Sequence, residues 1–123
     1  MKVRSIHHVQ LAMPVGGEPE AIEFYGDLLG MPTSDKPPHL VARGGCWFET
    51  DEVSLHLGVD QDFRPARKAH PAFLVDDLSE LEQRLSGSGI SVVTDEELPG
   101  YRRFYVNDPF GNRIELIEEV GLR

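Results

Sequence analysis

The feature that most constrains the fold of this chain is an internal repeat with a period of roughly 60 residues. An alternating, strand-like run over residues 6–13 is followed by apolar residues at helical spacing over residues 18–29, and then by short strand-like runs. The same order begins again at residue 70. The repeat is one of pattern rather than of residue identity, and it predicts one domain built from two similar modules, at about residues 1–60 and 68–123.

The predicted elements define the fold class. In the first half, Asp51-Glu52 is expected to close a hairpin between the runs 47–50 and 53–57. The second half is expected to hold a strand, a helix and three more strands, at residues 70–75, 78–85, 90–93, 103–106 and 112–117. Six or more strands with two helices, each packed on one side of a sheet, predict an α+β domain whose other sheet face curves around a cavity.

Composition excludes several classes of partner. The 123 residues contain 12 Lys and Arg against 21 Asp and Glu, a net charge of −9, which would repel a nucleic acid backbone. No apolar run approaches the ~20 residues of a membrane helix, and no signal peptide is recognisable. Cys46 is the only cysteine and lies in an apolar stretch, so we expect a buried, inert thiol and a cytoplasmic protein.

Metal-ligating residue types occupy equivalent places in the two halves. His8 and His70 lie on the first strand of each half, and His56 and Glu115 lie on the last. In each strand the flanking apolar residues point to the opposite face, so all of these side chains are expected to face the concave side. Imidazole nitrogen and carboxylate oxygen suit divalent ions such as Zn, Ni, Mn or Fe(II), and this donor set does not choose between them.

Three segments of the sequence resemble a known family. They are Ile6-His7-His8-Val9-Gln10-Leu11-Ala12, Phe24-Tyr25-Gly26-Asp27-Leu28-Leu29-Gly30-Met31 and Asp108-Pro109-Phe110-Gly111-Asn112-Arg113-Ile114-Glu115-Leu116. Together they are similar to the vicinal oxygen chelate superfamily, which includes glyoxalase I, fosfomycin- and bleomycin-resistance proteins and extradiol dioxygenases. The resemblance implies two βαβββ modules with curved mixed sheets enclosing a cavity, the glyoxalase-like fold, and a homodimer. It places the family's metal ligands on His8, His56, His70 and Glu115.

The resemblance leaves three functions open. The first is a metal-dependent, glyoxalase-like lyase or isomerase that acts on a small substrate chelated through vicinal oxygens. Glyoxalase I commonly has a carboxylate where His56 stands, so Glu115 is the obvious catalytic carboxylate here. The second is a metal-free binding or sequestration protein of the bleomycin-resistance type. The third is a small Fe(II) dioxygenase that uses His8, His70 and Glu115.

Other polar residues are candidates for contact with the substrate. Gln10, Arg103 and Tyr105 are expected to line the cavity, where the planar guanidinium of arginine suits an anionic group. His7 faces away from His8 in the strand pattern, and His39 follows two prolines in an expected loop. Neither of these histidines is therefore counted as a ligand.

Overall fold

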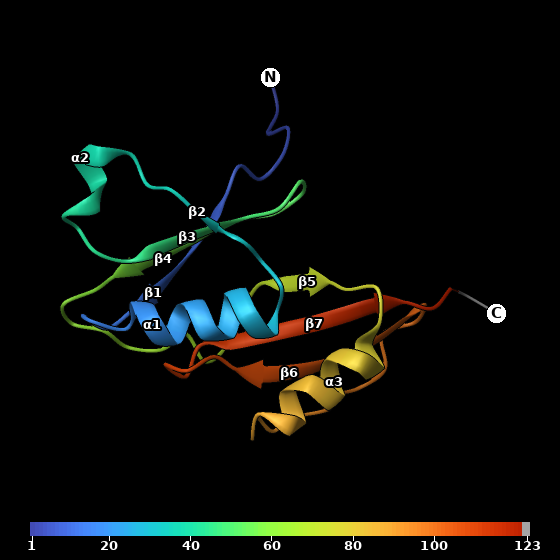
Figure 1. Ribbon diagram of the computed structural model, residues 1–123. Helices are drawn as coiled ribbons and strands as arrows, with labels where there is room; N and C mark the ends of the chain where they lie inside the picture. Colours follow the sequence, from blue (N-terminus) through green and yellow to red (C-terminus); the bar gives the residue numbers. More distant parts are fainter. Residues whose placement is uncertain (122–123) are drawn as a thin grey trace. The chain divides into compact units, whose positions relative to one another are not determined.

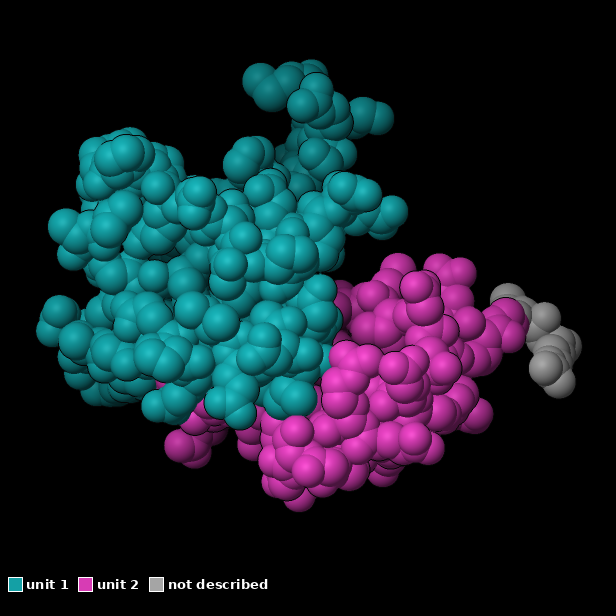
Figure 2. Space-filling view, in the orientation of Figure 1, with its two compact units in different colours: residues 1–64 teal, residues 65–123 magenta. Residues whose placement is uncertain are grey.

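The computed structural model describes residues 1–121 and divides the chain into two compact units (Figure 2). Unit 1 comprises residues 1–64, and unit 2 begins at residue 65. The last two residues of the predicted second module, 122–123, lie outside the described residues. None of the helices within the described part has the length and apolar character that crossing a bilayer demands.

Unit 1 is a mixed sheet with one main helical segment (Figure 1). Its elements are β1 (Val9–Met13), α1 (Glu18–Ala21), η1 (Ile22–Leu28), β2 (Thr33–Ser34), α2 (Pro38–Val41), β3 (Cys46–Glu49) and β4 (Ser54–Val59). The strand order is β1-β4-β3-β2, with β1 parallel to β4 and the other pairs antiparallel. The predicted hairpin is confirmed as β3 and β4, and the rings of Tyr25 and Phe48 meet in the core between η1 and the sheet.

The helix expected over residues 18–29 is present, but its second part has wider turns. After α1, the segment η1 is a π-helix, and the Leu29 N–H donates to the carbonyl of Phe24, five residues back. Apolar spacing does not distinguish this turn from an α-helical one, because both bury Phe24 and Tyr25 on one side. Gly30 ends the segment with a φ of +75°, as a helix stop requires. The short helix α2, which contains His39, was not expected.

Unit 2 repeats the design with a smaller mixed sheet. Its elements are β5 (Ala72–Leu74), α3 (Leu78–Gly87), β6 (Tyr101–Asn107) and β7 (Arg113–Glu119), with strand order β5-β7-β6. The predicted helix is confirmed; the Asp77 side chain accepts from the Glu80 N–H and caps it. The strand expected over residues 90–93 is reduced to one bridge, in which Val93 exchanges both backbone hydrogen bonds with Tyr105.

The repeat is visible in strand register. Gln10 of β1 lies opposite His56 of β4, and Ala72 of β5 lies opposite Glu115 of β7, in parallel pairs in both units. His8 lies two residues before Gln10, and His70 lies two residues before Ala72. The α+β class and the two mixed sheets are therefore as predicted, and the expected ligands occupy equivalent places in the two units.

Candidate functional site

In unit 1 the two predicted ligands lie against each other. His8, just before β1, stacks on His56 of β4 with ring centroids 4.4 Å apart and planes inclined by 20°. His8 is exposed, whereas His56 is only 9% exposed. The parallel pairing of β1 with β4 produces this contact, because it brings the residue two before Gln10 beside His56.

Trp47 covers the other side of His56. It lies opposite His56 in the β3–β4 pair, and the two rings are 3.9 Å apart and inclined by only 3°. Since β4 lies between β1 and β3, the imidazole of His56 is held between His8 and Trp47. Trp47 was not among the predicted site residues, although a hairpin closed at Asp51-Glu52 already sets it opposite His56.

His7 also takes part in this cluster. Its Nδ1 lies 2.9 Å from Nδ1 of His8, so one ring donates a hydrogen bond and the other accepts it. The rings meet edge to face at 5.2 Å. Alternation along a strand predicted that His7 points away from His8. The strand β1 begins only at Val9, so the alternation does not apply to these two residues.

Burial keeps His56 uncharged. Its pKa is lowered from 6.5, first by burial and then by the neighbouring His8 and His7. A neutral imidazole is the form that binds a metal ion.

The lowered pKa of His56 predicts a loss of stability in acid. Below pH 6.5 the unfolded chain takes up a proton at His56 before the folded chain does, which favours unfolding. We expect the free energy of unfolding of chelator-treated protein to fall with decreasing pH, by up to about 1.4 kcal/mol per pH unit, and to level off once folded His56 is protonated. In urea titrations His56→Gln should reduce this slope and His39→Gln should keep it. An unchanged slope in His56→Gln would contradict the assignment.

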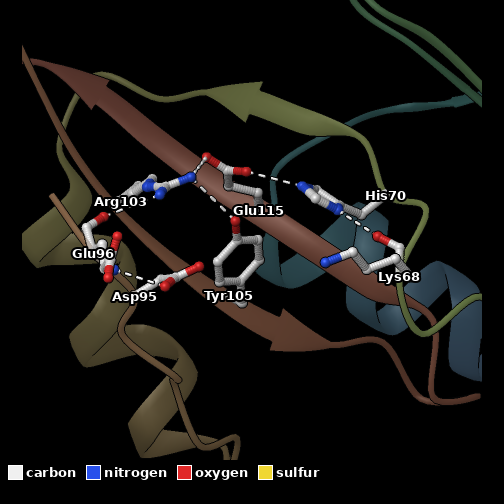
Figure 3. A network of polar contacts seen from close by, with 7 residues as sticks. All are labelled: Lys68, His70, Asp95, Glu96, Arg103, Tyr105 and Glu115. Carbon is white, nitrogen blue, oxygen red and sulfur yellow. Dashed lines mark hydrogen bonds and ion pairs between the residues drawn. The ribbon is translucent and has the colours of Figure 1, made fainter. Parts of the chain in front are cut away.

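In unit 2 the other two predicted ligands are directly hydrogen bonded (Figure 3). His70 Nε2 lies 2.9 Å from Oε1 of Glu115, and its Nδ1 lies 2.8 Å from the carbonyl oxygen of Lys68. A carbonyl only accepts, so Nδ1 is the donor in the contact with Lys68. Glu115 is 5% exposed, so its contact with His70 is shielded from solvent.

Arg103 and Tyr105 of β6 complete the surroundings of Glu115 (Figure 3). Arg103 Nη1 donates to Oε2 of Glu115 at 3.3 Å and to the Tyr105 hydroxyl at 3.1 Å. Its Nη2 donates to the carbonyl of Glu96 at 3.0 Å. Burial, and then the Glu115 carboxylate, raise the pKa of Tyr105, so its hydroxyl keeps its proton. Arg103 thus contacts the candidate catalytic carboxylate.

Sequence reasoning missed Arg113, whose guanidinium carbon lies 3.8 Å from the centroid of the Tyr105 ring. This is the geometry of a cation–π contact. The pairing of β6 with β7 could have indicated this contact. In that pair Arg113 lies opposite Asn107, and Tyr105 lies opposite Glu115.

A cavity of about 730 Å³ opens within unit 1, and it is called the larger cavity here because it adjoins a cavity of about 220 Å³. Its lining includes His7, His8, His56, Trp47 and Gln10, together with residues of the segment 34–40. The volume lies in the range that binds small organic molecules. Two predicted ligands and one predicted substrate contact, Gln10, therefore face the same cavity.

The predicted ligands lie in two pairs, His8 with His56 and His70 with Glu115, and their donor atoms are of types that bind divalent ions. Within residues 1–121 no group of three or more His, Cys, Asp or Glu side chains is arranged to hold a metal ion, and each unit contributes two of the predicted donors. In unit 2, His70 donates from Nδ1 to a carbonyl, which is how proteins commonly orient a ligating histidine, and its Nε2 lies beside a carboxylate oxygen of Glu115. In unit 1, His56 is held neutral.

Cys46 is half-buried rather than fully buried, so the expected burial is only partly confirmed. Burial, and secondarily Glu18, raise the pKa of Cys46 to about 11, with Lys36 opposing them. The thiol is therefore protonated at neutral pH and is a poor nucleophile.

Comparison with known proteins agrees with this architecture. The model of the Glyoxalase/Bleomycin resistance protein/Dioxygenase superfamily matches residues 5–116. A glyoxalase family protein from Bacillus anthracis has a similar structure, with a TM-score of 0.91 and 50% identity over 97% of this chain and 98% of that chain. No curated protein matches the sequence.

Two more distant structures share the fold alone. Lactoylglutathione lyase from Agrobacterium tumefaciens has a TM-score of 0.74 and 23% identity, over 95% of each chain. A fosfomycin resistance protein from Listeria monocytogenes has a TM-score of 0.76 and 13% identity, over 97% of this chain and 96% of that chain.

Proposed function

Because the chain belongs to the glyoxalase/bleomycin resistance protein/dioxygenase superfamily, we propose that it is a metal-dependent lyase or isomerase of the glyoxalase type. Its substrate is a small molecule that binds through two vicinal oxygens. The observation that carries the proposal is the placement of two donor pairs, His8 with His56 and His70 with Glu115, at equivalent register positions in the two units.

His8, His56, His70 and Glu115 are the proposed ligands of a divalent ion, Zn, Ni, Mn or Fe(II). When bound, such an ion polarises substrate oxygens and stabilises negative charge that develops on them. Glu115 is the catalytic base, and Arg103 orients its carboxylate through Oε2. His70 contacts Oε1 of Glu115, and Gln10 contacts the substrate in the larger cavity. We further propose that the protein works in the cytoplasm as a homodimer, since members of this family often form dimers.

Metal content tests the proposal. Protein purified without a histidine tag should contain one equivalent of a divalent metal per chain, measured by mass spectrometry of the elements. His8→Ala and Glu115→Gln should each lose metal, because each removes a proposed ligand. His39→Gln, a change in α2, is the control and should keep it. Retention of metal by both ligand variants would overturn the assignment.

Activity assays separate the enzyme classes. Turnover of methylglyoxal in the presence of a thiol, lost in Glu115→Gln, is expected for a glyoxalase-type reaction. Uptake of oxygen with catechols would instead indicate the Fe(II) dioxygenase, in which His8, His70 and Glu115 hold the iron.

One observation favours a metal-free binding protein as the second candidate. Both carboxylate oxygens of Glu115 already have partners, His70 on one side and Arg103 on the other, and Trp47 adds an aromatic wall to the larger cavity. If this is the function, the purified native protein should contain no metal and should bind an aromatic or peptide-like compound tightly.

A further inference from the structure

A second, smaller cavity lies in unit 1 beside the larger one. It has a volume of about 220 Å³ and is formed by β1, β3, β4 and the segment that contains α2. Four residues line both cavities: Gln10, Lys36, Leu40 and Trp47. The two cavities therefore share a wall, and a ligand that lies along it reaches from the histidine cluster into the smaller cavity.

The smaller cavity carries positive charge. Among the described residues that line it, the charged ones are Lys36 and Arg43, whereas the larger cavity also has Asp35 and Glu49. This is unusual in a chain with a net charge of −9. Two cations that line a cavity of this size fit an oxyanion.

These two cations are not ion-paired within the described chain. Lys36 Nζ donates to the carbonyl of Gly44, the residue after Arg43, and neither cation forms an ion pair within residues 1–121. The carboxylate of Glu18 lies near Gly44, where its Oε2 accepts the N–H of Gly45 at 2.8 Å, and it forms no ion pair with either cation. Lys36 and Arg43 are thus available to an anion from outside the chain.

A glycine keeps the shared wall open for a polar contact. A Cβ at Gly58 would lie 2.6 Å from Nε2 of Gln10, so any other residue at position 58 would displace the Gln10 amide from its position over β4. Gln10 consequently faces both cavities, next to Leu40 and Trp47, which offer apolar surface.

We propose that the smaller cavity is a subsite for the terminal oxyanion of the substrate, a carboxylate or a phosphate, held by Lys36 and Arg43. The inference rests on the proposed function, because it takes the reacting end of the same substrate to lie in the larger cavity, beside His8 and His56. A short apolar stretch of the substrate lies along Leu40 and Trp47. The substrate class is therefore a small molecule with vicinal oxygens at one end and a carboxylate or phosphate at the other.

Binding to chelator-treated protein tests the subsite independently of any metal. Trp47 is the only tryptophan and lines both cavities, so its fluorescence reports occupancy. The probes are 3-phenylpropionate, 2-phenylethyl phosphate and the neutral 3-phenylpropionamide. At least one of the two anions should bind about tenfold more tightly than the amide, and the tighter one identifies the oxyanion. Equal binding of all probes, or no binding of either anion at millimolar concentration, would overturn the proposal.

Variants assign the effect to the two cations. Arg43→Met changes an exposed side chain and should weaken binding of the preferred anion about tenfold, with binding of the amide unchanged. Lys36→Met should act in the same direction. Arg64→Met removes a cation of unit 1 whose side chain is 85% exposed and is the control. An effect of Arg64→Met as large as that of Arg43→Met would reduce the result to net charge and refute the subsite. Loss of metal in His8→Ala without loss of anion binding separates the two proposals.

Discussion

Gly45→Ala is expected to lower the free energy of unfolding by about 4 kcal/mol or more, as measured by urea titration. A Cβ at this position would lie 2.1 Å from the carbonyl oxygen of Leu57 and 3.2 Å from its carbonyl carbon, and backbone atoms of a paired strand cannot move aside. The φ of Gly45 is +82°, which adds strain for any other residue. Cys46 pairs with Leu57, so relief of the clash means separating β3 from β4 where Trp47 meets His56.

Gly16→Ala is the matched control for that change. Gly16 has a φ of +81°, nearly the same as Gly45, but a Cβ there would meet no atom within 4 Å. Only the backbone strain remains, and we expect a loss of about 1 kcal/mol. Similar losses in the two variants would show that φ, rather than the approach of β4, decides the requirement for glycine at position 45.

Asn112→Ala is expected to lower the free energy of unfolding by about 3 kcal/mol. Asn112 is 1% exposed and joins two segments of unit 2: its Oδ1 accepts the N–H of Ala66 at 2.9 Å, and its Nδ2 donates to Oδ2 of Asp108 at 2.9 Å. The alanine removes both bonds and deprives the buried carboxylate of Asp108 of a donor. Chemical unfolding measures the loss.

Two further variants test the role of the Asn112 amide. Asn112→Asp keeps the shape but sets a second carboxylate against Asp108, so it should destabilise the protein more than Asn112→Ala at neutral pH. Asn107→Ala, an exposed position of β6 at the same end of the strand pair, should change the stability by no more than about 0.5 kcal/mol. If Asn107→Ala cost as much as Asn112→Ala, the buried hydrogen bonds would not be the cause.

Much of the fold could be predicted because the relevant signals are local. Alternation identified the strands that became β3, β4, β6 and β7, and Leu78, Leu81 and Leu85 marked the buried side of α3. Two predictions differed from the structure. The strand expected over residues 90–93 pairs through Val93 alone, because its pairing depends on a strand elsewhere in the sequence. The π-helical turns of η1 were missed because apolar spacing does not distinguish them from α-helical turns.

The residues of the candidate site could be selected from the sequence, but their partners could not. Glu115 was predicted as a ligand and base, yet nothing near it in the chain indicates that Arg103 donates to its second oxygen. That contact depends on the β6–β7 register, in which Arg103 faces Ile117 and Tyr105 faces Glu115. Trp47 became part of the site in the same way, through its place opposite His56.

The sequence by itself determined the two-module α+β architecture, the family and the equivalent positions of His8, His56, His70 and Glu115. These features follow from periodic patterns and short motifs, which are properties of neighbouring residues in the chain. Tertiary structure alone decided the stacking of His56 between His8 and Trp47, the hydrogen bond between His70 and Glu115, and the cavity lined by Lys36 and Arg43. The reason is physical: such contacts join residues from different strands, and their distances are set by strand register and packing rather than by spacing in the sequence.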